Sequence, residues 1–336
     1  MPPSPRPPLL EVDNLSIAVT LPGARRVTAV EDVSFSVDAG EAVGLVGESG
    51  SGKSLTLRAI LGILPPGASV SAGRVRFEGK DLLAGNEAEL RNVRGRGITM
   101  IFQEPMTALN PVVRVGEQIV DAARGKRGWS RKVARAEALR LARHMGIPDA
   151  EACLSLYPHE LSGGLRQRVM IAAALACQPR LLLCDEPTTA LDVTIQAEIV
   201  ALLASLRAEL GMSLLYVTHN LALLAQLCRR VEVMYAGRIV ERGLIADTFA
   251  APSHPYTRGL VRATPDVDSV VDTLVGIPGS APPLGARPTG CSFHPRCETA
   301  TNACRTGDFP LRPLGNGRAS ACLYAERIGG LAGAGT

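Results

Sequence analysis

The run GESGSGKS at residues 47–54 constrains the fold of this 336-residue chain more than any other feature. It follows the apolar stretch AVGLV and precedes the helical stretch LTLRAILGIL, so the pattern G-x-x-x-x-G-K-S stands in its required order of strand, loop and helix. The glycines let backbone N–H groups converge on phosphate oxygens, while Lys53 reaches the terminal phosphates and Ser54 ligates Mg²⁺. The alternative is a glycine-rich turn with a chance lysine, which the flanking strand and helix disfavour. The run therefore predicts a phosphate-binding loop.

A second motif, RLLLCDEP at residues 180–187, ends an apolar strand in two carboxylates. Open α/β sheets bind ligands at the carboxyl ends of their strands. We expect Asp185 to hold Mg²⁺ through water and Glu186 to orient or deprotonate the attacking water. An apolar run ending in Asp-Glu is a weak signal by itself, because many strands end in acids at a solvated edge. Together with the phosphate-binding loop it predicts an ATPase.

The region from Leu9 to Gly243 alternates short β-rich runs with helical patterns, which is typical of a mostly parallel sheet covered by helices. The strand pattern stops between Gln103 and Leu161. There, Ser130 and Gly146 bracket a predicted helix whose apolar positions recur every three residues, and the region is interpreted as an inserted helical subdomain. The predicted strands are 42–46, 97–102, 181–184 and 213–217; the predicted helix face is Val133, Ala136, Leu139 and Ala142.

Length and composition limit the number of domains and the class of protein. A length of 336 residues suggests roughly two domains, and a net charge of +4 with 20% charged residues argues against a dedicated nucleic-acid binder. The longest apolar stretches are too short to cross a bilayer, and MPPSPRPPLL lacks the apolar core of a secretory signal. We expect a disordered start at 1–8, a main domain at 9–250 with a helical subdomain at about 104–165, a C-terminal domain at 251–328 and a tail at 329–336.

The sequence LSGGLRQR at residues 161–168 narrows the function further. Ser162, Gly163 and Gly164 open a helix whose unpaired N–H groups form an anion site. No nearby strand or lysine completes a second nucleotide pocket in this chain. The site therefore requires a phosphate from elsewhere.

Through GESGSGKS, Gln103, LSGGLRQR, CDEPTTALD and the His219 of YVTH, in this order, the chain resembles the nucleotide-binding subunits of ABC transporters. The resemblance implies an α/β P-loop NTPase cassette with a mostly parallel sheet core, an N-terminal antiparallel β part and a small irregular cysteine-containing C-terminal domain. It also implies a head-to-tail pair of cassettes, in which ATP on one Walker motif is completed by the signature residues of the other subunit.

The resemblance carries roles to individual residues. Gln103 senses Mg²⁺ and the membrane partner, Asp192 lies at the dimer seam, and His219 contacts the γ-phosphate. With Glu186, these form the expected catalytic set, and Ser54, Gln103 and Asp185 form the expected Mg²⁺ set. The residues expected to bind ATP are Gly47, Ser49, Gly50, Ser51, Gly52, Lys53, Ser54 and Leu55, with Ser162, Gly163 and Gly164 of the signature.

Two positions depart from the commonest family pattern. Leu165 stands where the usual signature has Gln, a change typical of the oligopeptide importer branch. Val19 stands where many cassettes stack the adenine on an aromatic side chain. We therefore expect base stacking to be weaker there, or to be supplied from elsewhere.

The C-terminal segments HPYTRGL, IPGSAPPL and GCSFHPRC are similar to those of oligopeptide and dipeptide importer ATPases, and ILGILPP is similar to the D-type subunit. The resemblance implies a peripheral subunit on the cytoplasmic face of the inner membrane that energises peptide uptake. Its implied partners are two transmembrane permeases, a second F-type ATPase and an extracytoplasmic peptide-binding protein, without nucleic acid. Nickel, glutathione or another small solute is an alternative cargo, and a soluble ABC ATPase acting on nucleic acid is a more distant alternative.

The eight cysteines fall into two groups. Cys153, Cys177, Cys184 and Cys228 lie in apolar contexts and are expected to be small buried side chains. The other four, Cys291, Cys297, Cys304 and Cys322, are spaced C-x5-C-x6-C-x17-C, unlike zinc knuckles. Four thiolates suit zinc or an iron–sulfur cluster. Resemblance to the peptide-importer ATPases favours a [4Fe–4S] cluster with a structural or interface role, with zinc or no metal as alternatives.

Overall fold

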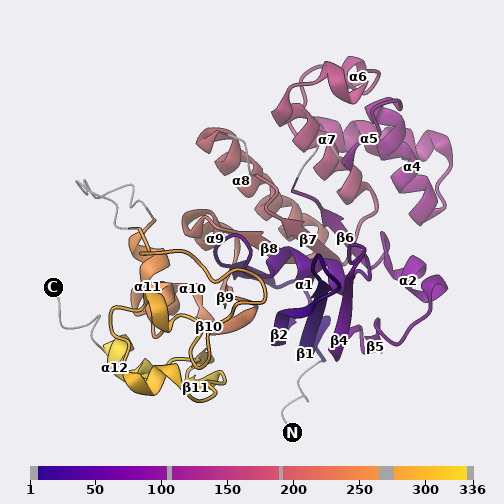
Figure 1. Cartoon of the computed structure of the whole chain (residues 1–336). Coiled ribbons are helices and arrows are strands. Elements are labelled where there is room, and N and C mark those ends of the chain that lie inside the picture. The colour runs from indigo at the N-terminus through magenta and orange to yellow at the C-terminus, as the bar shows by residue number, and fades with distance from the viewer. Residues whose placement is uncertain (1–6, 104–107, 189–191, 265–275, 331–336) are drawn as a thin grey trace, which may run out of the picture. The chain divides into compact units, whose positions relative to one another are not determined.

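The computed structural model describes residues 7–103, 108–188, 192–264 and 276–330, and Figure 1 shows their helices and strands. The chain divides into two compact units. The first comprises Met1–Asp38, Ala42–Leu83 and Val217–Thr336, and the second comprises Ala39–Glu41 and Ala84–Tyr216. Most of the expected disordered start and tail lies outside the described residues. Residues 329 and 330 end a helix, α12 (Ala325–Gly330).

The first unit contains a four-stranded antiparallel sheet in the order β2-β1-β4-β5. Inward-facing side chains of β1, such as Leu10, Leu15 and Ile17, are fully buried, which supplies the hydrophobic driving force for this sheet. This is the expected N-terminal antiparallel β part. Its strands are β1 (Leu10–Thr20), β2 (Arg26–Val37), β4 (Ala68–Phe77) and β5 (Lys80–Asp81).

A second sheet of the first unit runs in the order β11-β12-β10-β9-β3. Strand β3 pairs in parallel with β9, and the remaining neighbours pair antiparallel. A methyl group at Gly44 of β3 would lie 2.4 Å from Leu224 of α9, so the absence of a side chain there lets the helix approach the strand. The strands are β3 (Ala42–Val46), β9 (Arg230–Tyr235), β10 (Arg238–Leu244), β11 (Arg312–Gly315) and β12 (Arg318–Ser320).

Short helices complete the first unit. Helix α1 follows β3 and buries Leu57, Ala59 and Ile60. The C-terminal part, drawn in orange and yellow in Figure 1, contains α10, α11, α12 and two 3-10 turns together with β11 and β12. The helices are α1 (Lys53–Ile60), α9 (Leu221–Leu227), α10 (Ile245–Ala250) and α11 (Pro255–Arg262), and the turns are His294–Arg296 and Asn302–Arg305.

The second unit is built on strands in the order β8-β7-β6, of which β8 carries the chain back into the first unit. Strands β6 and β7 run parallel, with Ile98 opposite Leu181. Every residue of β7 and β8 is buried, as expected for strands covered on both faces. The predicted strands of this region are confirmed as β6 (Ile98–Ile101), β7 (Leu181–Asp185) and β8 (Ser213–Thr218).

Helices account for most of the second unit, and α4, α5 and α7 contact one another pairwise. Helices α4 and α5 lie in the region predicted to be helical, of which residues 104–107 lie outside the described part, whereas most of α7 follows that region. The helices of the unit are α2 (Glu87–Val93), α4 (Val115–Arg127), α5 (Arg131–His144), α6 (Ala150–Cys153), α7 (Gly163–Ala176) and α8 (Val193–Leu210), with a 3-10 turn at Pro158–Glu160.

Helix α5 begins as predicted but packs on a different face. Ser130 is its N-cap and accepts a hydrogen bond from the Val133 N–H at 3.4 Å. The predicted face with a three-residue repeat is wrong, because Val133 is 49% exposed. A straight helix repeats every 3.6 residues, so a strict three-residue spacing drifts around its surface. The buried side chains are Ala134, Ala138, Leu141 and Ala142.

The prediction for the early cysteines is confirmed: Cys153, Cys177, Cys184 and Cys228 are all buried. Among the described residues, none of the helices combines the length and apolar character needed to span a bilayer.

Candidate nucleotide-binding site

The phosphate-binding loop joins the buried strand β3 to α1, as the sequence predicts. Close approach by β9 explains two of its glycines. A methyl group at Gly47 would lie 2.1 Å from the carbonyl oxygen of Met234, and one at Gly52 would lie 2.7 Å from the Met234 side chain. Gly52 also has a φ of 106°, a conformation that favours glycine. Glycine therefore lets the loop pack closely against β9 and turn at Gly52.

Lys53 lies inside this loop. Its ammonium donates to the carbonyl oxygens of Gly47 at 2.7 Å and Glu48 at 3.0 Å, and the residue is only 5% exposed. A buried cation held by its own loop is ready to bind the terminal phosphates of a nucleotide. The neighbouring Ser54 and Leu55 are half-buried on the first turn of α1.

The side chains that hold this loop from outside were not predicted from the sequence. The Glu48 N–H donates to the Tyr256 hydroxyl at 2.7 Å, and Arg296 donates to both Glu48 carboxylate oxygens, at 2.6 and 2.9 Å. Hydrogen bonding to Glu48 raises the pKa of Arg296, and burial raises the pKa of Tyr256. The segments HPYTRGL and GCSFHPRC contain these residues, but no local pattern shows that they reach Glu48.

Tyr256 and Arg296 also belong to an aromatic cluster. The ring centroids of Tyr235 and Tyr256 are 4.5 Å apart, and Phe293 lies edge-on to Tyr235 at 5.2 Å. The Arg296 guanidinium lies 5.8 Å from the centroids of both Tyr235 and Phe293. The cation–π contacts and the ion pair together fix the orientation of Arg296.

The carboxylate pair lies at the end of β7 in the second unit. Asp185 is the last residue of the strand and is 2% exposed. Glu186 follows with a φ of 46°, a left-handed conformation that is rare for a residue with a side chain and that turns the backbone sharply after the strand. Both residues stand where the parallel-strand prediction puts them, at a carboxyl end.

Two glutamines that the sequence analysis did not identify brace the backbone after Glu186. Gln167 of α7 is 1% exposed and donates to the carbonyl oxygen of Pro187. Gln196 of α8 donates to the carbonyl oxygen of Thr188 at 2.9 Å. The signature motif LSGGLRQR could have identified Gln167, because this glutamine follows the predicted anion site by one helical turn. These bonds fix the turn that carries Glu186.

The signature residues open α7 as predicted. Ser162 is the N-cap, and its hydroxyl accepts from the Leu165 N–H at 3.3 Å. A methyl group at Gly163 would meet nothing within 4 Å, and one at Gly164 would meet only Ile195, at 4.0 Å. The start of this 14-residue helix therefore presents an accessible backbone.

The remaining predicted residues lie at element ends. Gln103 is exposed just after β6, and His219 is exposed just after β8. Asp192 is the N-cap of α8 and accepts from the Ile195 N–H at 2.9 Å; residues 189–191 of the same motif lie outside the described residues. The phosphate-binding loop and His219 belong to the first unit, whereas Gln103, Asp192, the carboxylate pair and the signature belong to the second.

The four late cysteines line one small cavity in the first unit, together with His254, Phe293 and His294. Burial, reinforced by the other cysteines, raises the pKa of Cys291 and raises that of Cys322 to about 11, which favours their thiol forms. Across the described residues, no three His, Cys, Asp or Glu side chains stand in a geometry ready to hold a metal ion. The cysteines therefore converge on one cavity without forming a ligand cage.

This fold and phosphate-binding loop define a P-loop ATPase of the ATP-binding cassette type. Residues 30–189 match the model of the ABC transporter family, and residues 240–304 match that of the oligopeptide/dipeptide transporter C-terminal region. The chain belongs to the ABC transporter family and carries the C-terminal region of its oligopeptide/dipeptide branch.

Similar proteins share nearly the whole chain. The dipeptide transport ATP-binding protein DppD of Escherichia coli (strain K12) is 47% identical over 316 residues, covering 94% of this chain and 96% of that protein. The oligopeptide transport ATP-binding protein OppD of Haemophilus influenzae is 44% identical over 322 residues, covering 96% and 99%. Among solved structures, the ATP-binding cassette MJ0796 bound to ADP and Pi has a TM-score of 0.64 and 28% identity, covering 70% of this chain and 98% of that one.

Proposed function

We propose that this chain is the ATP-hydrolysing subunit of an ABC importer that energises uptake of dipeptides or oligopeptides across the cytoplasmic membrane. One observation carries the proposal: identity of 44 to 47% with dipeptide and oligopeptide transport ATP-binding proteins continues through the C-terminal region, beyond the cassette shared by all ABC transporters. The subunit acts peripherally, on the cytoplasmic face of that membrane.

ATP binds to the phosphate-binding loop of residues 47–54. Lys53 contacts its terminal phosphates, and Leu55, in the first turn of α1, also belongs to the binding site. Ser54, Gln103 and Asp185 would hold Mg²⁺, and their hydroxyl, amide and carboxylate oxygens are the hard donors that this ion prefers. When bound, Mg²⁺ neutralises charge on the β and γ phosphates. Glu186 takes a proton from the attacking water, and His219 contacts the γ-phosphate.

A second cassette completes the site. Ser162, Gly163 and Gly164 of one subunit contact the γ-phosphate bound by the other, and Asp192 lies at the seam between them. The accessible start of α7 supports this role, because the N–H groups of a helix N-terminus bind anions. The partner cassette is a second, F-type ATPase, and the pair docks on two permease subunits that receive cargo from an extracytoplasmic peptide-binding protein.

The four late cysteines are proposed as the ligands of a [4Fe–4S] cluster, with zinc as the alternative. Their convergence on one cavity supports the donor set, since four thiolates suit either metal. The role is structural, within a C-terminal domain proposed at residues 251–328 beside a cassette at 9–250. Anaerobic purification followed by assays of iron, acid-labile sulfide and zinc tests the assignment. A chain that holds neither metal, with the same fold after Cys297→Ser, would contradict it.

Affinity purification tests the transporter assignment. A tagged Glu186→Gln chain is purified with ATP from gently solubilised membranes, and every co-purifying protein is identified by mass. We expect two multi-spanning permeases and a second ATPase. Recovery of ribosomes, nucleic acid or only soluble proteins would contradict the proposal.

A further inference from the structure

A cavity of about 290 Å³ lies beside the phosphate-binding loop, within the first unit. Val27, Thr28 and Ala29 of β2 line it, together with Gly50 of the loop. The C-terminal segment of residues 282–287, here called the proline loop, also lines it and contributes Pro283, Leu284 and Arg287 among others. The size is near that of small-ligand pockets.

The position of this cavity limits what occupies it. Gly50 belongs to the loop that cradles the phosphates, so the ribose and base of a nucleotide held there must extend into a neighbouring space. Val19, at the position where many cassettes have an aromatic, pairs with Val27 across the sheet but does not line the cavity. None of the described lining residues is aromatic. A base bound in this cavity would therefore contact the aliphatic side chains that line it.

The proline loop is held firmly against β2. The Ala286 N–H donates to the Pro283 carbonyl oxygen at 2.9 Å and closes a turn, in which Gly285 has a φ of 81°. A methyl group at Gly285 would lie 2.8 Å from Val27, and the Arg25 guanidinium donates to the Gly285 carbonyl oxygen at 3.2 Å.

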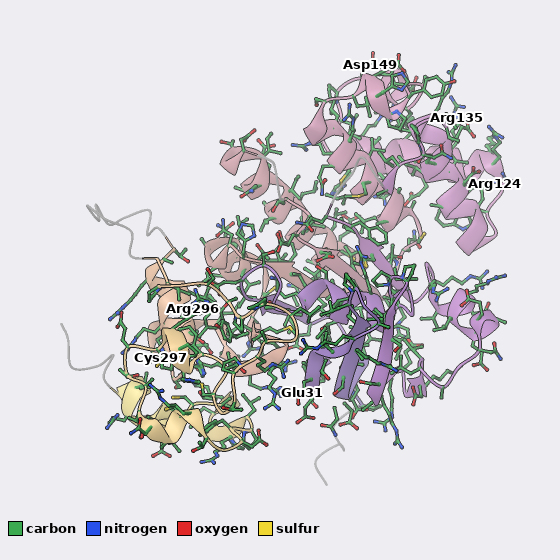
Figure 2. All side chains as sticks on the ribbon, in the orientation of Figure 1. Glu31, Arg124, Arg135, Asp149, Arg296 and Cys297 are labelled. Atoms are coloured by element: carbon green, nitrogen blue, oxygen red, sulfur yellow. The ribbon has the colours of Figure 1, made fainter. Side chains whose placement is uncertain are left out.

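An ion pair anchors the end of the proline loop. Arg287 pairs with Glu31 of β2, which is labelled in Figure 2. Arg238 of β10 pairs with the other oxygen of the same carboxylate at 2.9 Å. A methyl group at Gly237 would lie 2.6 Å from Arg287, so this guanidinium packs directly on the turn between β9 and β10. The wall facing β2 is therefore preformed.

Leu284 stands at the tip of this wall with 44% of its surface exposed, although large apolar side chains are mostly buried in this chain. An exposed leucine beside two prolines offers a flat apolar surface without hydrogen-bond donors. Such a surface suits the face of a purine, because burying the face removes apolar area from water on both partners.

We propose that the proline loop forms one wall of the nucleoside site, so that the base and ribose of ATP bind between Leu284 and β2. The C-terminal region thereby contributes directly to nucleotide affinity. The inference rests on ATP binding by the phosphate-binding loop, which is part of the proposed function.

The test separates nucleoside contact from phosphate contact. Affinities of the full chain for ATP and for inorganic tripolyphosphate are measured by competition against a fluorescent ATP analogue. Leu284→Asp should weaken ATP binding by about tenfold and leave tripolyphosphate affinity unchanged, because only ATP carries a base. Leu284→Trp should strengthen ATP binding by about fivefold, through stacking. Val133→Asp, which places the same charge at an exposed apolar side chain on α5, should change neither affinity.

Equal ATP affinity in both Leu284 variants and the wild type would overturn the proposal. It would also be overturned if Leu284→Asp weakened both ligands in parallel and Leu284→Trp gave no gain, because the effect would then come from distortion of the phosphate-binding loop. If the wild-type chain binds tripolyphosphate as tightly as ATP, the proposed contact between the proline loop and the nucleoside would be overturned, but ATP binding by the phosphate-binding loop would not. Failure to bind either ligand would overturn the ATP-binding function as well.

Discussion

Arg296 and Glu48 form a two-point salt bridge between residues 248 positions apart in the chain. The Arg296 side chain is 5% exposed, and Figure 2 labels it next to Cys297, one of the four late cysteines. Glu48 is the second residue of GESGSGKS. The conformation of the phosphate-binding loop thus depends on the C-terminal cysteine segment of the same unit.

Removing this bridge should weaken nucleotide binding. Arg296→Met leaves the Glu48 carboxylate without its partner, and breaking a largely buried ion pair is costly. We expect the KM for ATP to rise about tenfold with little change in kcat, because Arg296 shapes the loop without touching the reacting atoms. Steady-state ATPase kinetics measure both constants.

Arg296→Lys is the matched control. It keeps the charge and loses the two-point geometry, so it should restore part of the affinity. An Arg296→Met chain with unchanged KM and an unchanged melting temperature would contradict the positioning role.

Glu186→Gln should abolish turnover while preserving ATP binding. The amide is nearly the same size as the carboxylate but cannot accept a proton from water, so hydrolysis should fall by about a thousandfold. ATPase rates and ATP affinity are measured on the same preparation. Hydrolysis at the wild-type rate would remove Glu186 as the catalytic carboxylate.

Lys53→Ala, unlike Glu186→Gln, should weaken ATP binding itself. Loss of the ammonium removes a charge-assisted contact with the phosphates, so the affinity for ATP should fall by about a hundredfold. Equilibrium binding of ATP checks this. The phosphate-loop assignment fails if Lys53→Ala binds ATP as tightly as the wild type.

Gly163→Ala distinguishes a functional glycine from a structural one. The added methyl group meets nothing within 4 Å, and alanine loses less backbone entropy than glycine on folding at this first position of α7. The variant should therefore melt at the same temperature as the wild type or slightly higher. ATP hydrolysis by the assembled transporter should nevertheless fall about tenfold or more, because the methyl group would stand in the proposed contact with the nucleotide of the other cassette. Full activity would show that Gly163 does not contact nucleotide.

Local patterns predicted the parts of the site that depend on short stretches of chain. GESGSGKS between AVGLV and a helix identifies the loop and Lys53, and RLLLCDEP identifies a buried strand that ends in carboxylates. The N-cap Ser130 was also predictable, because capping involves neighbouring residues. The packing face of α5 was not, since it depends on α4 and α7.

Contacts between distant segments escaped the sequence analysis for the same reason. Arg296 reaches Glu48, and Gln167 reaches Pro187, only after the chain has folded. The proline loop likewise lies against Val27 without any periodic signal. Side chains that support a motif therefore need the structure, whereas the motif itself does not.

The most direct test of the central claim measures ATP hydrolysis by the complete importer, reconstituted in membranes with its co-purified permeases, second ATPase and binding protein. The account predicts that dipeptides or oligopeptides raise the rate of ATP hydrolysis several-fold over the basal rate. It also predicts that Glu186→Gln removes the stimulated rate. Stimulation by nickel or glutathione with no response to any peptide would contradict the claim.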